Sequence, residues 1–455
     1  MSTQRIQTTI LIIGAGPTGL AAAISLVKQG VRDLLIVEET VRIAEASRAM
    51  TIHAATLEAL DSIGCADALV ELGIKGSGMQ LSDRTAPFMG AEFASLASYT
   101  RFPYVLLIPQ SSTEKVLEAQ LNALNVEVLR AEKAVGLQLN DDGALDVALE
   151  SGKVITAQYV IGADGARSAV SVILHMGHMK STSTHLHFEI RQLAGVGFAD
   201  PDGMPVDERL AQMILADVWF SYSHPNLPTD KVHATASGGR FFLTIPLPKS
   251  PESERVYRIG FNVPADAGPP PSNPHVSYLQ HHLDEQGPLY LSSDATVNPN
   301  PIHISNVVWS ARFRTHAAIA DQFLVRMGSQ AVSGRQTRGL VLLIGDAAHI
   351  HSPAGGLGMN LGIRDAVTLG PVLATHAASD HDSLPKNDQL LEDHVRTRKD
   401  RALSTIRLTK RIMSIANVLG SASLLGITYW LFRVVGSIPL VRRQVAWNLS
   451  GLGNR

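Results

Sequence analysis

The sequence TILIIGAGPTGL, residues 9–20, places a run of apolar residues directly before three glycines. The apolar run is typical of a buried strand, and the segment after the glycines is typical of a helix that ends at Gly30. A second apolar run, Leu34–Val37, ends at Glu38. The pattern therefore predicts a β-α-β unit of about 30 residues, the context in which a glycine turn binds a dinucleotide.

Each glycine of this turn has its own physical task. Gly14 permits the tight turn, Gly16 lets the backbone approach a pyrophosphate, and Gly19 allows the helix to pack closely on the strand. Pro17 and Thr18 lie within the same turn, at a helix N-terminus whose unpaired N–H groups attract phosphate. We expect all five residues to bind the cofactor.

Glu38 is placed at the end of the second strand, where a carboxylate can bind the ribose hydroxyls of an adenosine. Two alternatives stay open at this point. Glu38 can be a solvated carboxylate at a strand end, or the neighbouring Glu39 can take the ribose.

Two further glycine-containing stretches lie far along the chain. They read GADGARS at residues 162–168 and GDAAHIHSPAGGLGMN at residues 345–360. One glycine turn is weak evidence, but all three stretches, in this order and at this separation, resemble the FAD-dependent aromatic hydroxylases of the p-hydroxybenzoate hydroxylase type. These are single-component flavoprotein monooxygenases. The resemblance covers most of the first 175 residues and about 338–370, and it is thin in between.

The resemblance implies FAD as the bound cofactor and NADPH or NADH as a co-substrate. It places Asp346 on the ribitol chain, and it points the helix after Gly356 at the flavin, where the helix dipole favours the negative charge of the reduced ring. It also implies that the Pro353 carbonyl lies near the reacting oxygen. The other residues of this stretch implied to bind the cofactor are Gly358, Met359 and Asn360.

Three more positions match the resembling family. Arg48 and Gln110 correspond to an arginine and a glutamine near the cofactor, although Arg48 could be a surface arginine and Gln110 a helix cap. Asp164 belongs to the motif that family uses for both flavin and NAD(P)H contacts. Relatives usually continue after Ser168 with valine and arginine, whereas this chain has Ala169-Val170-Ser171. The docking of NAD(P)H, and the choice between NADH and NADPH, therefore stay open.

The order of elements predicts an α/β fold, in which a GxGxxG-type FAD-binding domain carries an inserted mixed-sheet substrate domain and is followed by C-terminal helices. Short alternating runs, histidines and prolines replace the β-α pattern from about 175 to 330. The predicted domains are a discontinuous FAD-binding domain of residues 1–75, 100–175 and 325–385, a substrate domain of residues 76–99 and 176–324, and a helical extension of residues 386–455.

Local patterns also predict single elements of the first domain. Helices are expected over Met50–Leu60 and Ser112–Leu124, the second with Ser111 or Ser112 near its cap. Strands are expected over Val154–Ile161 and Val341–Ile344, each running into one of the glycine stretches.

Composition excludes several classes of function. The 455 residues include 39 basic and 41 acidic side chains, so the concentrated positive charge that nucleic acid requires is not expected. Cys65 is the single cysteine, which excludes a disulfide framework and is typical of a small buried hydrophobe. No histidine pair has the spacing of metal ligands, so no metal site is expected, and His349 is interpreted as structural. We expect a cytoplasmic protein, either a monomer or a homodimer.

One C-terminal segment complicates this expectation. The stretch from Ile412 to Phe432 contains no charged residue and is long enough to span a bilayer. Serine, asparagine and glycine dilute its hydrophobicity, and a basic, leucine-rich ending follows. We expect docked C-terminal helices, with membrane contact through 412–432 as the alternative.

Taken with the resemblance, these features predict an FAD- and NAD(P)H-dependent monooxygenase that uses O2 to hydroxylate a phenolic or electron-rich aromatic compound through a C4a-hydroperoxyflavin, with secondary metabolism as one setting. The alternatives are a membrane-associated flavin epoxidase of an isoprenoid alkene, and a flavin oxidase or reductase without oxygen transfer. The sequence does not identify the base. Polar residues of the inserted domain that could serve in catalysis are Arg191, Tyr222 and Arg240.

Overall fold

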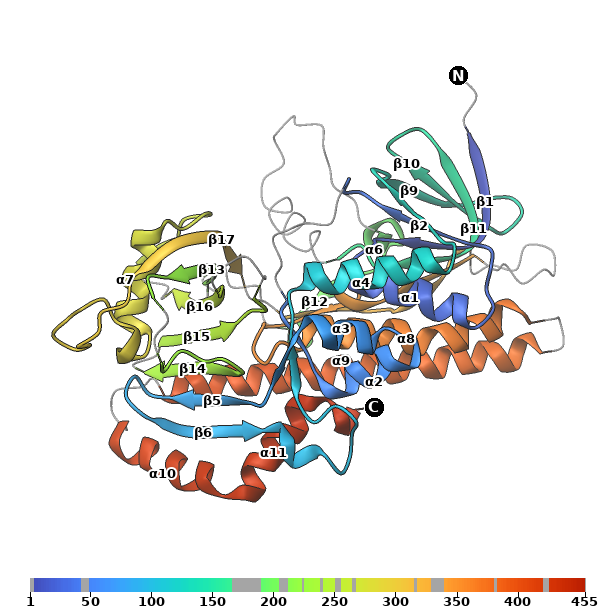
Figure 1. The fold of residues 1–455 in the computed structure, drawn as a ribbon. Helices are drawn as coiled ribbons and strands as arrows, with labels where there is room; N and C mark the ends of the chain where they lie inside the picture. The colour runs from blue at the N-terminus through green and yellow to red at the C-terminus, as the bar shows by residue number, and fades with distance from the viewer. Residues whose placement is uncertain are drawn as a thin grey trace.

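Two large sheets organise the chain, one built on parallel strands and one almost entirely antiparallel (Figure 1). A computed structural model describes residues 4–41, 49–165, 190–203, 212–222, 225–237, 240–249, 255–263, 267–314, 317–328, 339–379, 383–419 and 425–454.

The first sheet has eight strands and carries the three glycine stretches. Its main path is β19 (Leu324–Arg326), β20 (Leu340–Leu343), β11 (Val154–Gly162), β1 (Arg5–Ile13), β2 (Leu34–Glu38) and β8 (Val128–Arg130), and β10 (Leu145–Leu149) and β9 (Ala134–Leu139) extend it from β11. β20, β11, β1, β2 and β8 run parallel to one another. Because parallel strands end at a common edge, β1, β11 and β20 deliver their following turns to the same place.

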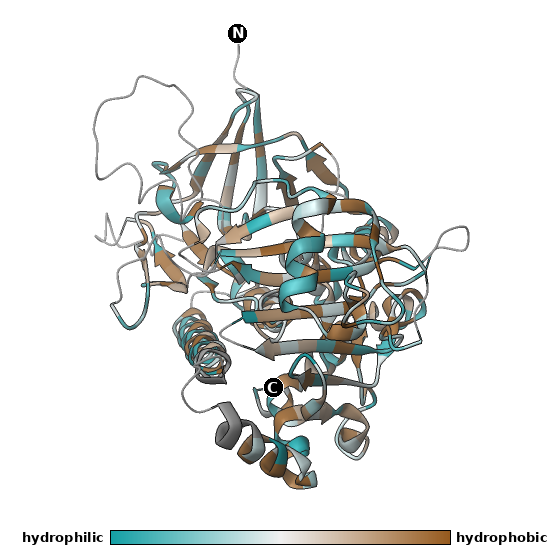
Figure 2. Cartoon of the chain, turned by 90° about the vertical axis from the view of Figure 1, so that its left-hand side faces the viewer, coloured by the Kyte–Doolittle hydropathy of each residue, from teal (hydrophilic) through white to brown (hydrophobic). Residues whose placement is uncertain are grey.

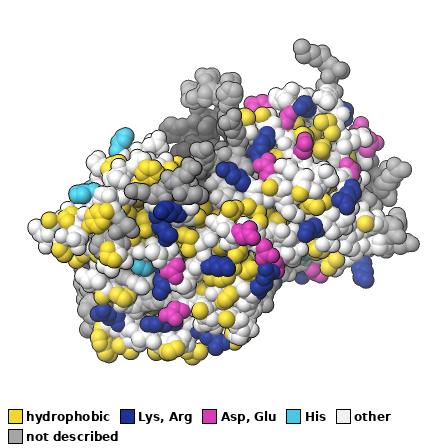
Figure 3. Space-filling view, viewed as in Figure 1, with side chains coloured by type: hydrophobic (Ala, Val, Ile, Leu, Met, Phe, Trp, Pro, Cys, Tyr) yellow, Lys and Arg dark blue, Asp and Glu magenta, His cyan; other side chains and the backbone are white. Residues whose placement is uncertain are grey.

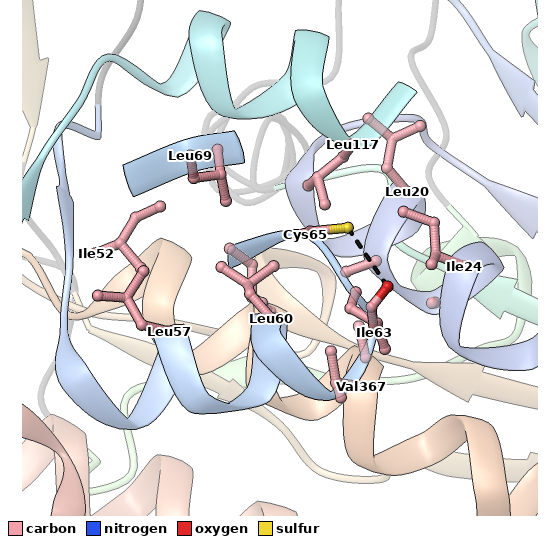
Figure 4. Close-up of a cluster of buried hydrophobic side chains, with 14 of the residues drawn as sticks. Leu20, Ile24, Ile52, Leu57, Leu60, Ile63, Cys65, Leu69, Leu117 and Val367 are labelled. Atoms are coloured by element: carbon pink, nitrogen blue, oxygen red, sulfur yellow. Dashed lines mark hydrogen bonds between the residues drawn. The ribbon is translucent and has the colours of Figure 1, made fainter. Parts of the chain in front are cut away.

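Both faces of this sheet are buried, as the continuous apolar run of β1 predicts. Ile10 and Ile12 belong to one hydrophobic core, while Leu11 and Ile13 belong to the other. On the first face, α1 (Pro17–Lys28), α2 (Ala54–Ser62), α3 (Ala66–Leu72) and α4 (Gln110–Ala123) contribute to the cluster drawn in Figure 4. Cys65 lies within this cluster, where burial raises the pKa of its thiol to about 11, so it is the buried hydrophobe that was predicted.

The second sheet has seven strands and stands beside the first (Figure 1). Its order is β17 (Ile304–Arg314), β13 (Gln212–Phe220), β16 (Tyr257–Val263), β15 (Arg240–Pro246), β14 (Lys231–Ser237), β5 (Gly78–Ser82) and β6 (Pro87–Glu92). Phe242 and Phe261 stack on one face of it, above α7 (Val276–Gln286). Residues 78–92 thus join the same sheet as strands from 212–314, although more than a hundred residues separate them in sequence.

Two small sheets connect these layers. One contains β12 (Phe198–Ala199), β18 (Ala318–Ala320) and β21 (His349–Ile350), and the other contains β3 (Thr51–Ile52), β7 (Val105–Leu107) and β4 (Ile74–Gly76). The short helices η1 (Phe93–Leu96), α6 (Ile190–Leu193), η3 (Leu289–Leu291), η4 (Gly345–Ala347) and η6 (Leu452–Asn454) complete the order.

Four helices make up the C-terminal part: α8 (Gly358–Ala377), α9 (Leu384–Leu419), α10 (Leu425–Ser437) and α11 (Pro439–Ser450). The apolar segment 412–432 is divided between the end of α9 and the beginning of α10. Among the helices of the described residues, none has the length and apolarity needed to cross a bilayer.

Two local predictions were wrong. The expected helix Met50–Leu60 begins only at Ala54, because Thr51 and Ile52 pair with Leu107 and Leu106 as strand β3. The helix α4 is capped by Pro109 rather than by Ser111 or Ser112. The start of the first helix was set by strand pairing with residues distant in sequence. The start of α4 was set by Pro109, just upstream of the predicted cap.

Candidate functional site

The first glycine turn is shaped so that only glycine fits at two of its positions. Gly14 has a φ of +102°, and a Cβ there would lie 2.4 Å from the Ala163 carbonyl oxygen. A Cβ on Gly19 would lie 1.8 Å from the Gly14 carbonyl oxygen. The turn, the helix α1 and the end of β11 are therefore in direct backbone contact.

Gly16 differs, because the space beside it is open. A Cβ built on Gly16 meets no atom of the described chain within 4 Å, and its φ of −71° is ordinary. Gly16 is also the N-cap of α1, and no side chain caps this helix end. The first-turn N–H groups thus stay available to an anion, as a pyrophosphate site requires.

Glu38 accepts three hydrogen bonds, one of which comes from this turn. Its Oε2 accepts from the Ala15 N–H at 2.8 Å, and its Oε1 accepts from the N–H and hydroxyl of Thr40 at 3.0 and 2.7 Å. Glu39 lies instead toward Asp164, whose pKa it helps to raise. Of the two carboxylates considered for the ribose, Glu38 is the one that contacts the glycine turn.

Asp164 of the second stretch presents a buried oxygen with no partner. The parallel pairing of β1 with β11 brings it beside the first turn, where the Ala163 N–H donates to the Ile13 carbonyl at 2.8 Å. Its Oδ2 accepts from the Ile190 N–H at 2.9 Å, whereas Oδ1 has no hydrogen-bond partner among the described residues. Burial raises the pKa of this carboxyl to about 6. A donor from a bound hydroxyl would satisfy Oδ1.

The third stretch reaches the same edge through β20. Gly345 has a φ of +59°, and a Cβ there would lie 2.7 Å from the Thr18 hydroxyl oxygen in the first turn of α1. A Cβ on Gly362 of α8 would lie 2.5 Å from the same atom. Asp346, which follows Gly345, is exposed beside this junction. All three glycine stretches therefore meet at one edge of the parallel sheet.

Asn360 and His53 hold the glycine loop before α8 in place. The side-chain amide of Asn360 donates to the carbonyls of Thr51 and Gly356 at 2.8 and 2.7 Å. Its Oδ1 accepts from the backbone N–H of His53 at 2.8 Å. The His53 imidazole bonds the Gly355 carbonyl through Nε2 at 2.8 Å. Both amide hydrogens of Asn360 are therefore used within this loop, and its side chain is buried. Met359 is half-buried against the large core.

Two histidines beside this loop have their proton positions set by geometry. Since a carbonyl can only accept, His53 carries its proton on Nε2, and His351, which bonds the Ser352 carbonyl at 2.8 Å, carries its proton on Nδ1. Burial lowers the pKa of both imidazoles to about 4, so they are neutral. The opposite ring nitrogens, His53 Nδ1 and His351 Nε2, are buried and have no partner in the described part of the chain.

A buried ion network lies behind the third stretch. The Asp365 carboxylate accepts from His349 Nε2 at 2.6 Å, from Arg398 Nε at 2.6 Å and from the Gly345 N–H at 3.3 Å. Burial alone would raise the pKa of Asp365, but Arg398 and His349 hold it well below its usual range. His349 therefore makes a structural contact, in agreement with its interpretation from the sequence. Asp365 and Arg398 were missed, because neither belongs to a motif.

The remaining residues predicted to lie near the cofactor are Arg48, Gln110 and Pro353. Arg48 lies outside the described residues. Gln110 donates to Glu114 Oε1 at 2.8 Å and accepts from the Ala49 N–H at 3.4 Å, so it anchors the chain next to residues 42–48. The Pro353 carbonyl accepts from the Gly356 N–H at 2.9 Å, which closes a turn at an exposed position.

The three candidate catalytic residues do not come together. Arg191 is buried in α6, donates to the Ala347 carbonyl at 3.2 Å and lies 3.9 Å above the Phe198 ring, so it contacts the third stretch. Tyr222 follows the last residue of β13, whereas Arg240 begins β15 at the opposite end of the seven-stranded sheet, as the register through β16 shows. Tyr222 donates to the Asn300 carbonyl, and Arg240 pairs with Glu285 at 2.5 Å.

Comparison with known proteins is consistent with a cofactor site at the sheet edge where the three glycine stretches meet. The FAD binding domain family matches residues 7–275 and 317–407, most of the chain. The chain belongs to this family. The resemblance inferred from the glycine stretches is thereby confirmed, and so is the predicted fold class, an α/β FAD-binding fold with mixed sheets and C-terminal helices.

Individual relatives are monooxygenases. Rifampicin monooxygenase of Streptomyces venezuelae is 28% identical over 371 residues, which are 80% of this chain and 63% of that protein. Pentachlorophenol 4-monooxygenase of Sphingobium chlorophenolicum is 28% identical over 374 residues, 81% of this chain and 58% of that protein. The OxyS anhydrotetracycline hydroxylase structure from Streptomyces rimosus superposes with a TM-score of 0.67 at 25% identity, covering 98% of this chain and 76% of that one. The chain thus spans about 60% of the length of these two curated relatives.

Proposed function

We propose that this protein is an FAD- and NAD(P)H-dependent monooxygenase that uses O2 to hydroxylate a phenolic or electron-rich aromatic compound. The observation that carries the proposal is the meeting of three glycine stretches at one sheet edge, with an uncapped helix and an unpartnered buried carboxylate oxygen beside them. The aromatic substrate class is supported by relatives named for pentachlorophenol and anhydrotetracycline.

The residues present fit FAD. Gly16 and the first turn of α1 would hold its pyrophosphate, Glu38 the adenosine ribose, and Asp346 the ribitol chain. Asp164 Oδ1 is a buried acceptor without a donor among the described residues, so a cofactor hydroxyl or amide would complete it. Bound FAD would supply electron transfer from NAD(P)H and the activation of O2, which no side chain can perform.

The protein itself would stabilise negative charge on the cofactor, fix the loop beside it and exclude water. The N-terminus of α8 has no side-chain cap, so its N–H groups at Gly358–Asn360 are free to stabilise developing negative charge on the cofactor. The clamp formed by His53 and Asn360 fixes the loop that precedes this helix end. The Pro353 carbonyl accepts one hydrogen bond from Gly356, so its second lone pair would be able to accept a hydrogen bond from a hydroxyl near the reacting oxygen.

Arg191 is proposed to position the third stretch rather than to act on substrate. Its guanidinium is buried between the Ala347 carbonyl and the Phe198 ring. Tyr222 and Arg240 lie at opposite ends of the seven-stranded sheet, so at most one of them could contact a small substrate.

The test is turnover with isotopically labelled oxygen. The purified protein with FAD is given NADPH or NADH and a panel of phenols in ¹⁸O2, and NAD(P)H consumption and product mass are followed. A product that gains one ¹⁸O atom on an aromatic ring supports the proposal, and the ratio of kcat/KM for the two nucleotides assigns the donor. Oxidised nucleotide with hydrogen peroxide alone on every phenol would favour an oxidase or reductase, and ¹⁸O in an epoxide of an isoprenoid alkene would favour an epoxidase.

A further inference from the structure

Helix α10 is held firmly on one side. Phe432 meets Phe88 of β6 edge-on at 6.4 Å between ring centroids. Gly436 is buried so closely against the same strand that a Cβ there would lie 2.4 Å from the Phe88 carbonyl oxygen. The Gly436 carbonyl in turn accepts from Arg442 Nε of α11 at 2.7 Å. The position of α10 is therefore fixed by close packing.

From Trp430 onward, the other side of α10 is apolar and faces outward. Large hydrophobic side chains stand exposed along it and at the start of α11, and we call them the apolar ridge: Trp430 (65% exposed), Leu431 (52%), Val434 (42%), Ile438 (43%) and Leu440 (73%). Trp430, Leu431 and Val434 lie within α10, where their spacing places them on one side of the helix. Figure 2 shows hydrophobic residues along these helices near the C-terminus. A docked helix that keeps a second apolar side in water is unusual and marks an interaction surface.

Positive charge accompanies the ridge. Residues 401–455 contain eight of the 39 lysines and arginines of the chain and none of its 41 acidic residues. Arg433 and Arg443 are exposed beside the ridge, and Arg442 is half-buried. The carboxylates that reach these arginines are Asp83, whose pKa Arg433 helps to lower, and Glu92, which lies 3.7 Å from Arg442. Figure 3 shows basic and hydrophobic side chains together along the lower edge, where Figure 1 places α10 and α11.

We propose that the apolar ridge docks on the surface of a bilayer that contains anionic lipids, with α10 lying in the plane of the interface. A tryptophan, aliphatic side chains and flanking arginines are the composition that such a surface binds. None of the described helices is able to cross the bilayer, so the contact is peripheral.

A second copy of the chain fits the ridge less well. In a two-fold dimer the same patch meets itself, which would bring Arg433 and Arg443 of both copies together around a small apolar contact. A standard interface also buries about 800 Å² per partner from 20 or more residues, far more than the five side chains of the ridge provide. An anionic lipid surface meets both features without repulsion. The proposal does not depend on the proposed enzymatic function.

Vesicle flotation with the full-length, FAD-loaded protein tests this. We expect at least fivefold more protein to float with phosphatidylcholine vesicles containing about 30% phosphatidylserine than with phosphatidylcholine alone, and less at high salt because surface charges are screened. The double variant Trp430→Ser/Leu431→Ser should lose at least four-fifths of this binding. A matched variant, Val297→Ser/Val308→Ser, removes two exposed valines elsewhere and should bind like the wild type. Thermal unfolding and FAD content show that each variant is folded.

Fluorescence locates the contact independently of folding. Lipids brominated on their acyl chains should quench part of the tryptophan emission, and Trp430→Phe should abolish that quenching although Trp219, Trp309 and Trp447 remain. The proposal is overturned if no vesicle type carries the protein, or if Trp430→Ser/Leu431→Ser binds like the wild type. It is also overturned if light scattering shows a dimer that this double variant disrupts while vesicles stay unbound.

Discussion

Nε2 of His349 lies 2.6 Å from Oδ2 of Asp365, and both side chains are at most 2% exposed. His349 begins β21 within the stretch that contains Asp346, and Asp365 lies on α8, which begins at the end of the glycine loop. The carboxylate also binds Arg398 of α9, which is nearly as buried. This contact therefore ties the proposed cofactor loop to two helices.

Replacement of Asp365 with asparagine should destabilise the protein by about 3–5 kcal/mol, because it leaves Arg398 buried without its counter-charge. Urea unfolding of the wild type and the variant measures this. Asp393→Asn is the control, since it breaks the exposed pair with Arg396 and should cost less than about 1 kcal/mol. Equal effects from the two substitutions would contradict a structural role for the buried network.

Alanine at Gly14 should reduce folding stability, whereas alanine at Gly16 should reduce the affinity for FAD. Gly14→Ala introduces a Cβ 2.4 Å from a carbonyl oxygen at a φ of +102°, so we expect a loss of at least about 3 kcal/mol of folding stability. Gly16→Ala adds a methyl group to open space at an ordinary φ, so the FAD-free protein should unfold within about 1 kcal/mol of the wild type. Its affinity for FAD should nevertheless fall by more than tenfold, because the methyl group would occupy the space that a pyrophosphate needs. Tight FAD binding by Gly16→Ala, measured by flavin fluorescence, would remove this turn from the site.

Asp346→Ala should weaken FAD binding. A hydrogen bond from a ribitol hydroxyl to a carboxylate contributes about 1.5–3 kcal/mol, which corresponds to a Kd raised roughly 10- to 150-fold. Asp142→Ala, at an exposed turn between β9 and β10, controls for loss of a surface carboxylate and should leave the Kd unchanged. Equilibrium dialysis against FAD gives both constants, and wild-type affinity in Asp346→Ala would exclude this role.

Parts of the site that depend on backbone geometry could be predicted from the sequence. Gly14 is required by a φ of +102° within the turn and Gly19 by its contact with Gly14 five residues away, so their spacing carries the information. The meeting of the three stretches followed once each was placed after a buried strand, because parallel strands share an edge. The family and the fold class were accessible for this reason.

Contacts between side chains far apart in sequence were not accessible in this way. His53 bonds the Gly355 carbonyl across 302 residues, and neither position carries a local pattern that announces the other. Thr51 and Ile52 form a strand only because Leu106 and Leu107 arrive beside them, which overrode a helical pattern. Arg191 was assigned by its sequence position to the inserted domain, yet its side chain is buried against Ala347.

The neutral buried histidines should make the FAD-free protein acid-sensitive in a defined range. Burial lowers the pKa of His53, His351 and His394 to about 4, below the value of about 6.5 in an unfolded chain. Between these values the unfolded state binds protons that the folded state does not. The stability that these groups contribute is therefore present above pH 6.5 and is lost as the pH falls toward 4.

Each such histidine contributes a slope of at most about 1.4 kcal/mol per pH unit in the free energy of unfolding. Urea titrations at fixed pH values from 7 to 4.5 should show this decline, offset in part by the raised pKa of Asp164, and His53→Asn should make its slope shallower. His281→Gln, which replaces an exposed imidazole, should leave the decline in place. Loss of stability from Asp365 follows only at lower pH, because its pKa lies below the usual carboxyl range. A free energy of unfolding that stays constant between pH 6.5 and 4.5 would show that these imidazoles are protonated in the folded protein.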